Sequence, residues 1–418
     1  MMEYVFVLNY MTVISVCYGA SIGGNNVCTN FQAYSNLQYD RKHCHYNPDV
    51  DSTPFQIAER YGYKLEDHQV ETEDGYILTI FRVRKIGDNL ENRQPALLQH
   101  GILVDGVSWM ISGKDSLAFT LVANGIDLWV PNSRGTQFSS KHVNSSISEK
   151  DYWNFSFHEL ASKDLPAIIQ YVSKSTKRKD LIYIGHSMGS TSVLVYSTLH
   201  GDHAKEHIKG IICLAPVAYL RSLQGIARLA VPFYPLIKEI LEVLGLYALG
   251  QFTALQKFIL SFTCSKFPLI LPCQIINALS TGLAVEQVRP DILPLIMTNF
   301  PSGTSTKTLY HYSQIFLSGG NFQWYDYGSA KNEILYNSTK PPDYDIEKIS
   351  VPVHIFSGKR DFLATHEDVK YLYSRLNCSK EFHVYDLAHN DYAYGKRVNK
   401  LYSDILDVMK NKFNTGYS

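Results

Sequence analysis

Short runs of apolar residues recur along the chain and are separated by longer segments with helical periodicity. Runs that are apolar throughout, rather than alternating, are typical of strands in parallel sheets covered on both faces. Helices are predicted over 159–180 and 400–413. The pattern therefore predicts an α/β protein with a mostly parallel central sheet flanked by helices. The strand-like runs are ALLQH (96–100), IDLWV (126–130), LIYI (181–184), GIICLA (210–215), PVHIF (352–356) and EFHVY (381–385).

The pattern changes between residues 218 and 344. The stretch 221–262 is unusually apolar with a helical period, and Pro232 and Pro235 interrupt it. Strand-like runs resume only after NSTKPPDYD (337–345). We interpret 218–344 as an inserted, mostly helical cap. The alternative is an ordinary core, because a helix that is apolar on most of its circumference is usually buried somewhere. The sheet-forming core is then expected in two parts, 56–217 and 345–418.

The first residues, MMEYVFVLNYMTVISVCYGA, form an apolar stretch with the length of a signal peptide. Cys17 and Gly19 stand at suitable −3 and −1 positions for cleavage, although no Lys or Arg precedes the apolar region. Polar Asn9 interrupts the stretch, which argues against a permanent membrane span. We expect a signal peptide over 1–19 and an N-terminal extension over 20–55.

Sequons and cysteines also favour the secretory pathway. Six cysteines follow the predicted signal peptide. Cys264 and Cys273 flank a short apolar turn that a disulfide could close, Cys28 and Cys44 could pair in the extension, and Cys213 lies in an apolar run typical of a buried thiol. N-glycosylation candidates are Asn144, Asn154, Asn337 and Asn377.

Composition limits the classes of function. The formal net charge is zero, which argues against a nucleic-acid partner. Hydrophobic residues make up 45% of the chain, enough for a large core. The sequence contains no C-x-x-C motif and no His/Cys cluster typical of a metal site, so we expect no metal and no cofactor.

The pentapeptide GHSMG (185–189) stands between a predicted strand and a predicted helix. This context is that of the nucleophile elbow, in which a strained turn projects a serine above the sheet. Glycines on both sides let strand and helix approach closely. The pattern predicts Ser187 as the nucleophile.

A serine hydroxyl needs a base to take its proton. In proteins with a nucleophile elbow, the acid and then the base follow the serine in the chain. Asp361 and His389 each come just after one of the last two predicted strands. Backbone N–H groups should hold the oxyanion. We expect them from Met188, which follows the nucleophile, and from Ile102 in the loop HGILVD (100–105).

Several stretches together resemble the acid lipase family of the α/β-hydrolases, which includes gastric and lysosomal acid lipases. The similarity extends from about residue 61 to the C-terminus. Two departures are Met188, where the family commonly has Gln, and YDYG (325–328), where YDWG is usual. The matching stretches are LLQHGIL, VPNSRGTQFS, FHELASKDLPAIIQYV, GHSMG, LAPVAYL, FQWYDYG, PPDYD and SGKRDFLA.

The resemblance implies a secreted or lysosomal serine esterase that acts on long-chain esters at a lipid–water interface, touching lipid only peripherally. It implies the same Ser187, Asp361 and His389 triad, a Cys264–Cys273 disulfide, and a lid, which we place within 225–275. Triacylglycerol and sterol ester are both open as substrates. The alternatives are a lipid-binding or storage protein that has lost its chemistry, and an esterase or acyltransferase for small esters.

Overall fold

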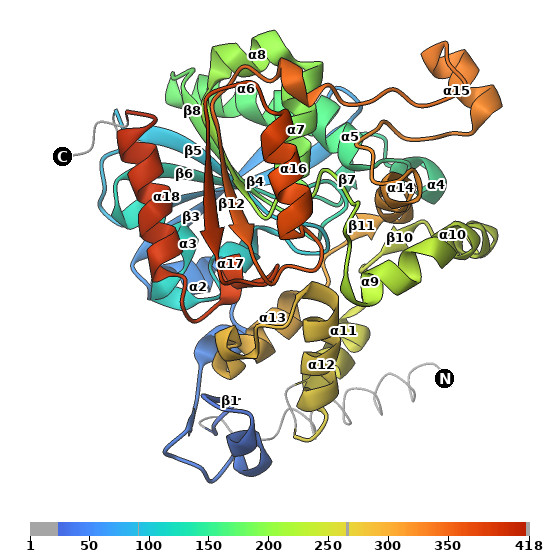
Figure 1. Cartoon of the computed structure of the whole chain (residues 1–418). Helices are drawn as coiled ribbons and strands as arrows, with labels where there is room; N and C mark the ends of the chain where they lie inside the picture. Colours follow the sequence, from blue (N-terminus) through green and yellow to red (C-terminus); the bar gives the residue numbers. More distant parts are fainter. Residues whose placement is uncertain (1–23, 91, 265–266, 415–418) are drawn as a thin grey trace.

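The computed structural model describes residues 24–90, 92–264 and 267–414. A nine-stranded sheet forms its centre (Figure 1). The strands follow the order β13-β12-β9-β8-β5-β6-β4-β3, and β7 pairs with β4. The predicted α/β class with a mostly parallel sheet is confirmed.

All six apolar runs form strands of this sheet, and neighbours among them pair in parallel. Most residues of the five inner strands are buried, which explains why these runs are largely apolar rather than alternating. The edge strand β13 has no buried residue and carries Glu381 and His383. The bounds of the six strands are β5 Gln94–Gln99, β6 Ile126–Pro131, β8 Leu181–His186, β9 Ile208–Leu214, β12 Val353–Gly358 and β13 Lys380–Tyr385.

An antiparallel portion at one side of the sheet was not predicted. It consists of β3 (Tyr63–Glu71), β4 (Tyr76–Lys85) and the short β7 (Lys141–His142). Along β3 only Leu65 and Val70 are buried, and polar residues fill most other positions. This half-exposed strand therefore lacks the continuous apolar run on which the prediction relied.

Helices cover both faces of the sheet. In Figure 1, α3 (Leu117–Ala123) and α18 (Asn399–Asn411) lie on one side, and α6 (Leu165–Thr176), α7 (Met188–Leu199) and α16 (His366–Arg375) on the other. The helix expected over 159–180 is interrupted, because a π-helical turn at Leu160–Asp164 precedes α6. Asp164, at the end of this turn, is buried and binds Arg134.

Between β9 and β12, the described residues add no strand to the large sheet and are mainly helical. This region also contains a small antiparallel sheet of two strands, β10 (Ala248–Leu249) and β11 (Thr304–Ser305). In Figure 1, α11, α12 and α13 lie beyond the ends toward which the parallel strands point. The cap boundaries at 218 and 344 stay a prediction. The helices are α9 Gly225–Ala230, α10 Tyr234–Val243, α11 Ala254–Cys264, α12 Ile270–Thr281, α13 Leu293–Asn299, α14 Thr306–Leu317 and α15 Ser329–Tyr336.

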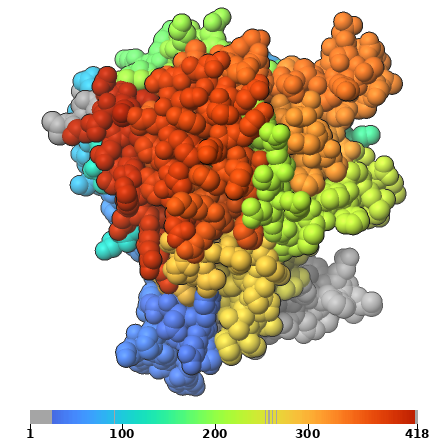
Figure 2. All heavy atoms as spheres, viewed as in Figure 1, coloured from blue at the N-terminus to red at the C-terminus, as the bar shows by residue number. Residues whose placement is uncertain are grey.

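Residues 24–53 form a small unit held by a disulfide between Cys28 and Cys44. β1 (Val27–Cys28) pairs there with β2 (Cys44–His45). Figure 2 shows the unit, in blue, against the gold cap helices. The Tyr34 hydroxyl donates to the carbonyl of Pro290 at 2.7 Å, so the extension docks on the cap. The predicted signal peptide falls outside the described residues.

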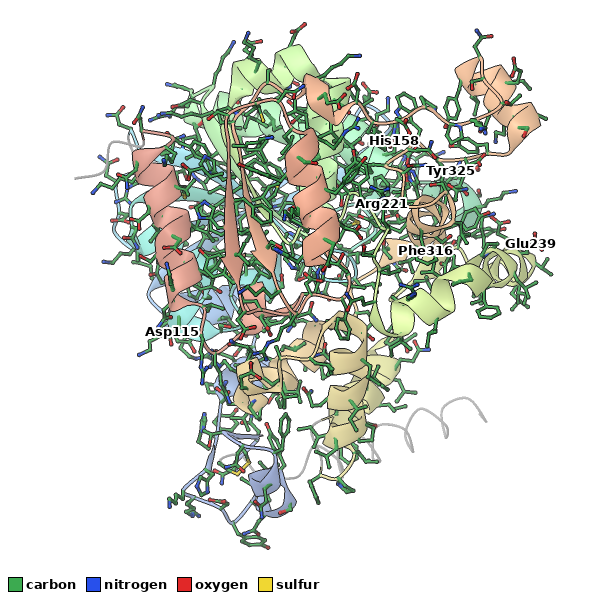
Figure 3. The ribbon with its side chains drawn as sticks, in the orientation of Figure 1. Asp115, His158, Arg221, Glu239, Phe316 and Tyr325 are labelled. Carbon is green, nitrogen blue, oxygen red and sulfur yellow. A yellow bond between two sulfur atoms is a disulfide. The ribbon has the colours of Figure 1, made fainter. Side chains whose placement is uncertain are left out.

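Aromatic side chains join the cap to the core near α14. His158, on the short helix α5 (Phe157–Glu159), contacts the Tyr344 hydroxyl through Nδ1 at 2.7 Å and packs against the ring of Trp324. Figure 3 shows His158 and Tyr325 close together there, whereas Glu239 lies far from the sheet on α10. These partly buried contacts link this side of the cap to the core.

Candidate active site

Ser187 occupies the turn between β8 and α7 with φ +53° and ψ −117°. Left-handed backbone of this kind is costly for a residue with a side chain, and it projects the serine above the sheet. The flanking positions need glycine because any side chain there would clash with neighbouring backbone. A Cβ on Gly185 would lie 2.6 Å from the backbone carbonyl carbon of Gly189. One on Gly189 would lie 2.7 Å from the Gln99 carbonyl oxygen.

Three predicted residues meet at this turn. The His389 Nε2 atom lies 2.8 Å from the Ser187 Oγ, and the His389 Nδ1 atom lies 2.8 Å from the Asp361 Oδ2. All three side chains are buried. This chain of hydrogen bonds is the arrangement in which a histidine can take the serine proton while a carboxylate orients the ring.

The loops after β12 and β13 position the acid and the base. Asp361 accepts hydrogen bonds from the amides of Leu363 and Ala364 at 2.9 and 2.8 Å, which fixes the carboxylate. The carbonyl of His389 contacts the His186 Nε2 at 2.8 Å. Asp391 accepts the amide of Ala388 at 2.7 Å and so holds the turn that carries His389.

The two residues expected to bind the oxyanion through their amides are next to the nucleophile or in the loop that approaches it. Met188 is the first residue of α7, so its N–H has no partner within the helix. Ile102 lines the cavity above Ser187. A Cβ on the adjacent Gly101 would come within 3.2 Å of the Ser187 Cβ, which shows how closely this loop approaches the nucleophile.

Two other histidines near the serine are poor bases. His100 accepts the amide of Ser133 through Nε2 at 3.0 Å and contacts the carbonyl of Gly101 through Nδ1 at 2.7 Å. Burial lowers the pKa of His100 to about 4 and that of His186 to about 3. Both rings are therefore neutral structural groups near neutral pH.

A cavity of about 420 Å³ opens above Ser187 and His389. Its walls are largely apolar and come from both the core loops and the cap helices α11, α12 and α13. An apolar chamber with a few polar groups at one end suits a ligand with a long hydrocarbon part and one polar centre. Cap residues in the lining are Leu260, Cys264, Cys273, Ile276, Asn277, Ser280, Thr281, Ile296, Met297 and Phe300.

Contacts from the cap to the triad loops could not be read from the sequence. The carbonyl of Thr281, at the end of α12, accepts hydrogen bonds from the amides of His389 and Phe362 at 3.1 and 3.3 Å. No residue pattern marks such a backbone contact. His186 directly precedes Ser187, and Asp391 is two residues after His389. These positions were the only signal in the sequence for either residue, and that signal is weak.

The structure also shows where the cysteines and the sequons lie. Cys264 and Cys273 form a disulfide at the wall of the cavity, whereas Cys213 and Cys378 are free thiols. All four sequon asparagines are exposed. Within the part of the chain that the structure describes, no helix is both long and apolar enough to cross a membrane.

Fold and site geometry place this protein in the class of α/β-hydrolases. The description "alpha/beta hydrolase fold" matches residues 95–237, and "partial alpha/beta-hydrolase lipase region" matches residues 55–113. The α/β hydrolase GrgF from Penicillium sp. sh18 has a similar fold, with a TM-score of 0.50 at 16% identity over 84% of this chain and 99% of that one.

Closer relatives define the family. The chain is 32% identical to tear acid lipase-like protein of Mesocricetus auratus over 87% of this chain and 92% of that protein. It is 33% identical to human gastric triacylglycerol lipase and 32% identical to lysosomal acid lipase/cholesteryl ester hydrolase of Macaca fascicularis, with the same coverage in both cases. The chain belongs to the acid lipase family and is a carboxylic ester hydrolase. The resemblance seen in its motifs is confirmed.

Proposed function

We propose that this protein is a serine lipase that hydrolyses long-chain carboxylic esters through Ser187, His389 and Asp361. The observation that carries the proposal is the 2.8 Å contact between the Ser187 Oγ and the His389 Nε2, at the base of an apolar cavity. Relatives named as triacylglycerol and cholesteryl ester hydrolases support both ester classes as substrates.

The geometry supports a two-stage mechanism. Ser187 Oγ attacks the ester carbonyl while His389 Nε2 takes its proton, and the amides of Ile102 and Met188 bind the oxyanion. His389 then gives the proton to the leaving alcohol, and an acyl-enzyme remains on Ser187. Water activated by His389 releases the fatty acid. Asp361 stabilises the histidine cation and keeps Nε2 directed at the serine.

The apolar cap surface supports contact with lipid aggregates. We use this name for exposed apolar side chains on α9 to α12 and their connections, the segments coloured yellow-green and gold in Figure 2. Burying apolar surface contributes about 25 cal/mol per Å². A lid within 225–275 would therefore gain free energy at an interface. Among these residues are Leu229, Phe233, Leu236, Ile240, Val243, Leu244, Ile259, Phe262, Ile275 and Ile276.

Two disulfides and four exposed sequons support passage through the secretory pathway, toward either the extracellular space or the lysosome. Glycosidase treatment of protein expressed in animal cells should increase its electrophoretic mobility. Replacing each of the four asparagines by Gln should remove the shift stepwise at the sites that are used.

The test of function is fatty-acid release by the purified protein from emulsified long-chain triacylglycerol, emulsified sterol ester and a soluble short-chain ester, at acid and neutral pH. We expect hydrolysis of at least one emulsion, abolished in Ser187→Ala. Activity on the soluble ester alone would indicate a small-ester esterase. Lipid binding without any turnover would indicate a lipid-binding protein instead.

A further inference from the structure

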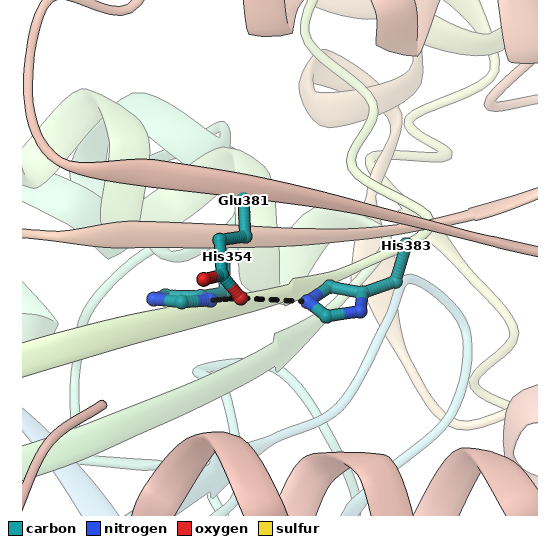
Figure 4. Close-up of side chains that lie close together, drawn as sticks. All are labelled: His354, Glu381 and His383. Atoms are coloured by element: carbon teal, nitrogen blue, oxygen red, sulfur yellow. Dashed lines mark ion pairs between the residues drawn. The ribbon is translucent and has the colours of Figure 1, made fainter. Parts of the chain in front are cut away.

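A second group of chemically active side chains lies on the last two strands of the sheet. β12 and β13 pair in parallel, and the register puts His354 beside Glu381. His383 is two residues beyond Glu381 in β13, so its side chain points to the same face of the sheet. Figure 4 shows the two imidazole rings on either side of the Glu381 carboxylate.

The ring nitrogens that face this carboxylate lack hydrogen-bond partners. Both His354 Nδ1 and His383 Nε2 are buried atoms for which no acceptor or donor is within bonding geometry. They lie 3.4 and 3.6 Å from the same oxygen, Glu381 Oε2. His354 is only 3% exposed, so water does not readily replace the missing partner. An unsatisfied buried imidazole needs an explanation.

The three atoms lie close enough together to contact one small cation. All lie within 4.8 Å of one another. Zinc–nitrogen and zinc–oxygen bonds of about 2.0–2.2 Å at tetrahedral angles put neighbouring ligand atoms about 3.3–3.5 Å apart. The two nitrogen–oxygen separations are close to this value. Two imidazoles and one carboxylate also form a ligand set that zinc prefers.

We propose that His354, Glu381 and His383 form a binding site for a zinc-type divalent transition-metal ion, with water as the fourth ligand. The site lies at the amino ends of β12 and β13, whereas Asp361 and His389 follow their carboxyl ends. Because β13 is the edge strand of the sheet, the ion would link it to its neighbour. Its role would therefore be structural and separate from ester hydrolysis.

The surroundings fit a supported site. Lys412 binds the other oxygen of Glu381 at 2.5 Å, which leaves Oε2 directed at the imidazoles. The His383 ring stacks on Phe356 at a centroid distance of 4.4 Å, and Phe413 packs edge-on against His354 at 5.1 Å. Lys412 adds a positive charge that opposes a cation, but its side chain is half exposed and is screened by solvent. The packed rings fix the directions of both histidines.

The test is calorimetric titration of the full chain with ZnCl2 after removal of metal by a chelator. Wild-type protein is compared with His383→Gln and Glu381→Gln, whose side chains are partly exposed and tolerate replacement better than buried His354. His45→Gln, which removes an exposed imidazole outside the group, is the matched control. Ester hydrolysis checks that each variant is folded, because neither ligand belongs to the catalytic machinery.

We expect one zinc ion per wild-type chain, with the melting temperature raised by zinc. Affinity should fall at least about tenfold in His383→Gln and Glu381→Gln and stay unchanged in His45→Gln. Failure of the wild-type protein to bind zinc would overturn the proposal. So would binding of equal strength in the two ligand variants, since the ion would then lie elsewhere.

Discussion

The carbonyl of Thr281 accepts a hydrogen bond from the amide of His389 at 3.1 Å, so the cap is bonded to the loop that carries the proposed base. Thr281 ends α12, and the same carbonyl accepts the amide of Phe362, next to Asp361. The end of one cap helix thus holds both loops of the triad. This predicts that the cap affects the positions of the catalytic groups as well as access of substrate.

Gly282→Ala tests this link. Gly282 has φ +131°, and a Cβ there would lie 1.9 Å from the carbonyl oxygen of Arg360. The clash should push α12 away from both loops. We expect kcat to fall at least about tenfold even on a soluble ester, because a displaced base loses catalytic geometry. Gly319→Ala, at φ +84° with no atom within 4 Å of the added Cβ, is the control for backbone strain alone. Equal activity in the two variants would contradict the link.

Asp361→Asn should leave the fold intact and lower kcat on the order of 10⁴-fold. An amide in place of the carboxylate favours the wrong tautomer of His389 and no longer stabilises its cation. Asp386→Asn is a matched control, because Asp386 is exposed and pairs with Arg360 rather than with a histidine. Steady-state kinetics and circular dichroism of both variants provide the measurement. A fall of less than about tenfold in Asp361→Asn would assign the acid to another residue.

Asp391 should make stability depend on pH. Burial, with smaller effects from Asp361 and Glu286, raises the pKa of Asp391 to about 7, although the bond from Ala388 opposes this shift. The folded protein then binds more protons than the unfolded chain between pH 4 and 7, so stability falls as pH rises through this window.

Asp391→Asn removes this titration and can still accept the Ala388 amide. We compare the free energy of unfolding of the variant with that of the wild type at each pH. This difference should favour the variant more at pH 8 than at pH 5, by on the order of 1 kcal/mol. Denaturant unfolding at the two pH values measures it. The same change in stability at both pH values would show that the Asp391 carboxyl does not titrate in this range.

Arg134 should contribute strongly to stability. It is 1% exposed, binds Asp74 and Asp164, and stacks on Tyr76 with 3.9 Å between the guanidinium carbon and the ring centroid. Arg134→Met leaves buried Asp164 without its partner, which should cost about 3–5 kcal/mol. Arg134→Lys should also destabilise, because one ammonium cannot bind both carboxylates in the same geometry. Arg375→Met, which removes an exposed pair with Glu347, should cost less than about 1 kcal/mol.

The sequence predicted those parts of the fold whose signals are local. Buried parallel strands are apolar throughout, and the elbow needs glycines on both sides of Ser187, so both could be recognised. The antiparallel strand β3 was missed because it is half exposed. The π-helical turn at Leu160–Asp164 was not predicted, and the long-range bond between Asp164 and Arg134 is likewise invisible in the local pattern.

The contacts that complete the candidate site come from distant parts of the chain. Thr281 reaches His389 through its backbone, so its side chain gives no signal. His354 and Glu381 stand 27 positions apart and meet only through the register of β12 and β13. Pairing of this kind depends on tertiary structure, which is why the proposed metal site could not be predicted.

Covalent labelling of Ser187 tests the central claim most directly. A nitrophenyl ester of a long-chain alkylphosphonate should react once per chain, and mass spectrometry should find the adduct on the peptide that contains Ser187. His389→Gln should react far more slowly, and Ser187→Ala should remain unlabelled. Stoichiometric labelling of Ser187→Ala, or an adduct on another residue of the wild-type protein, would contradict the assignment of the nucleophile.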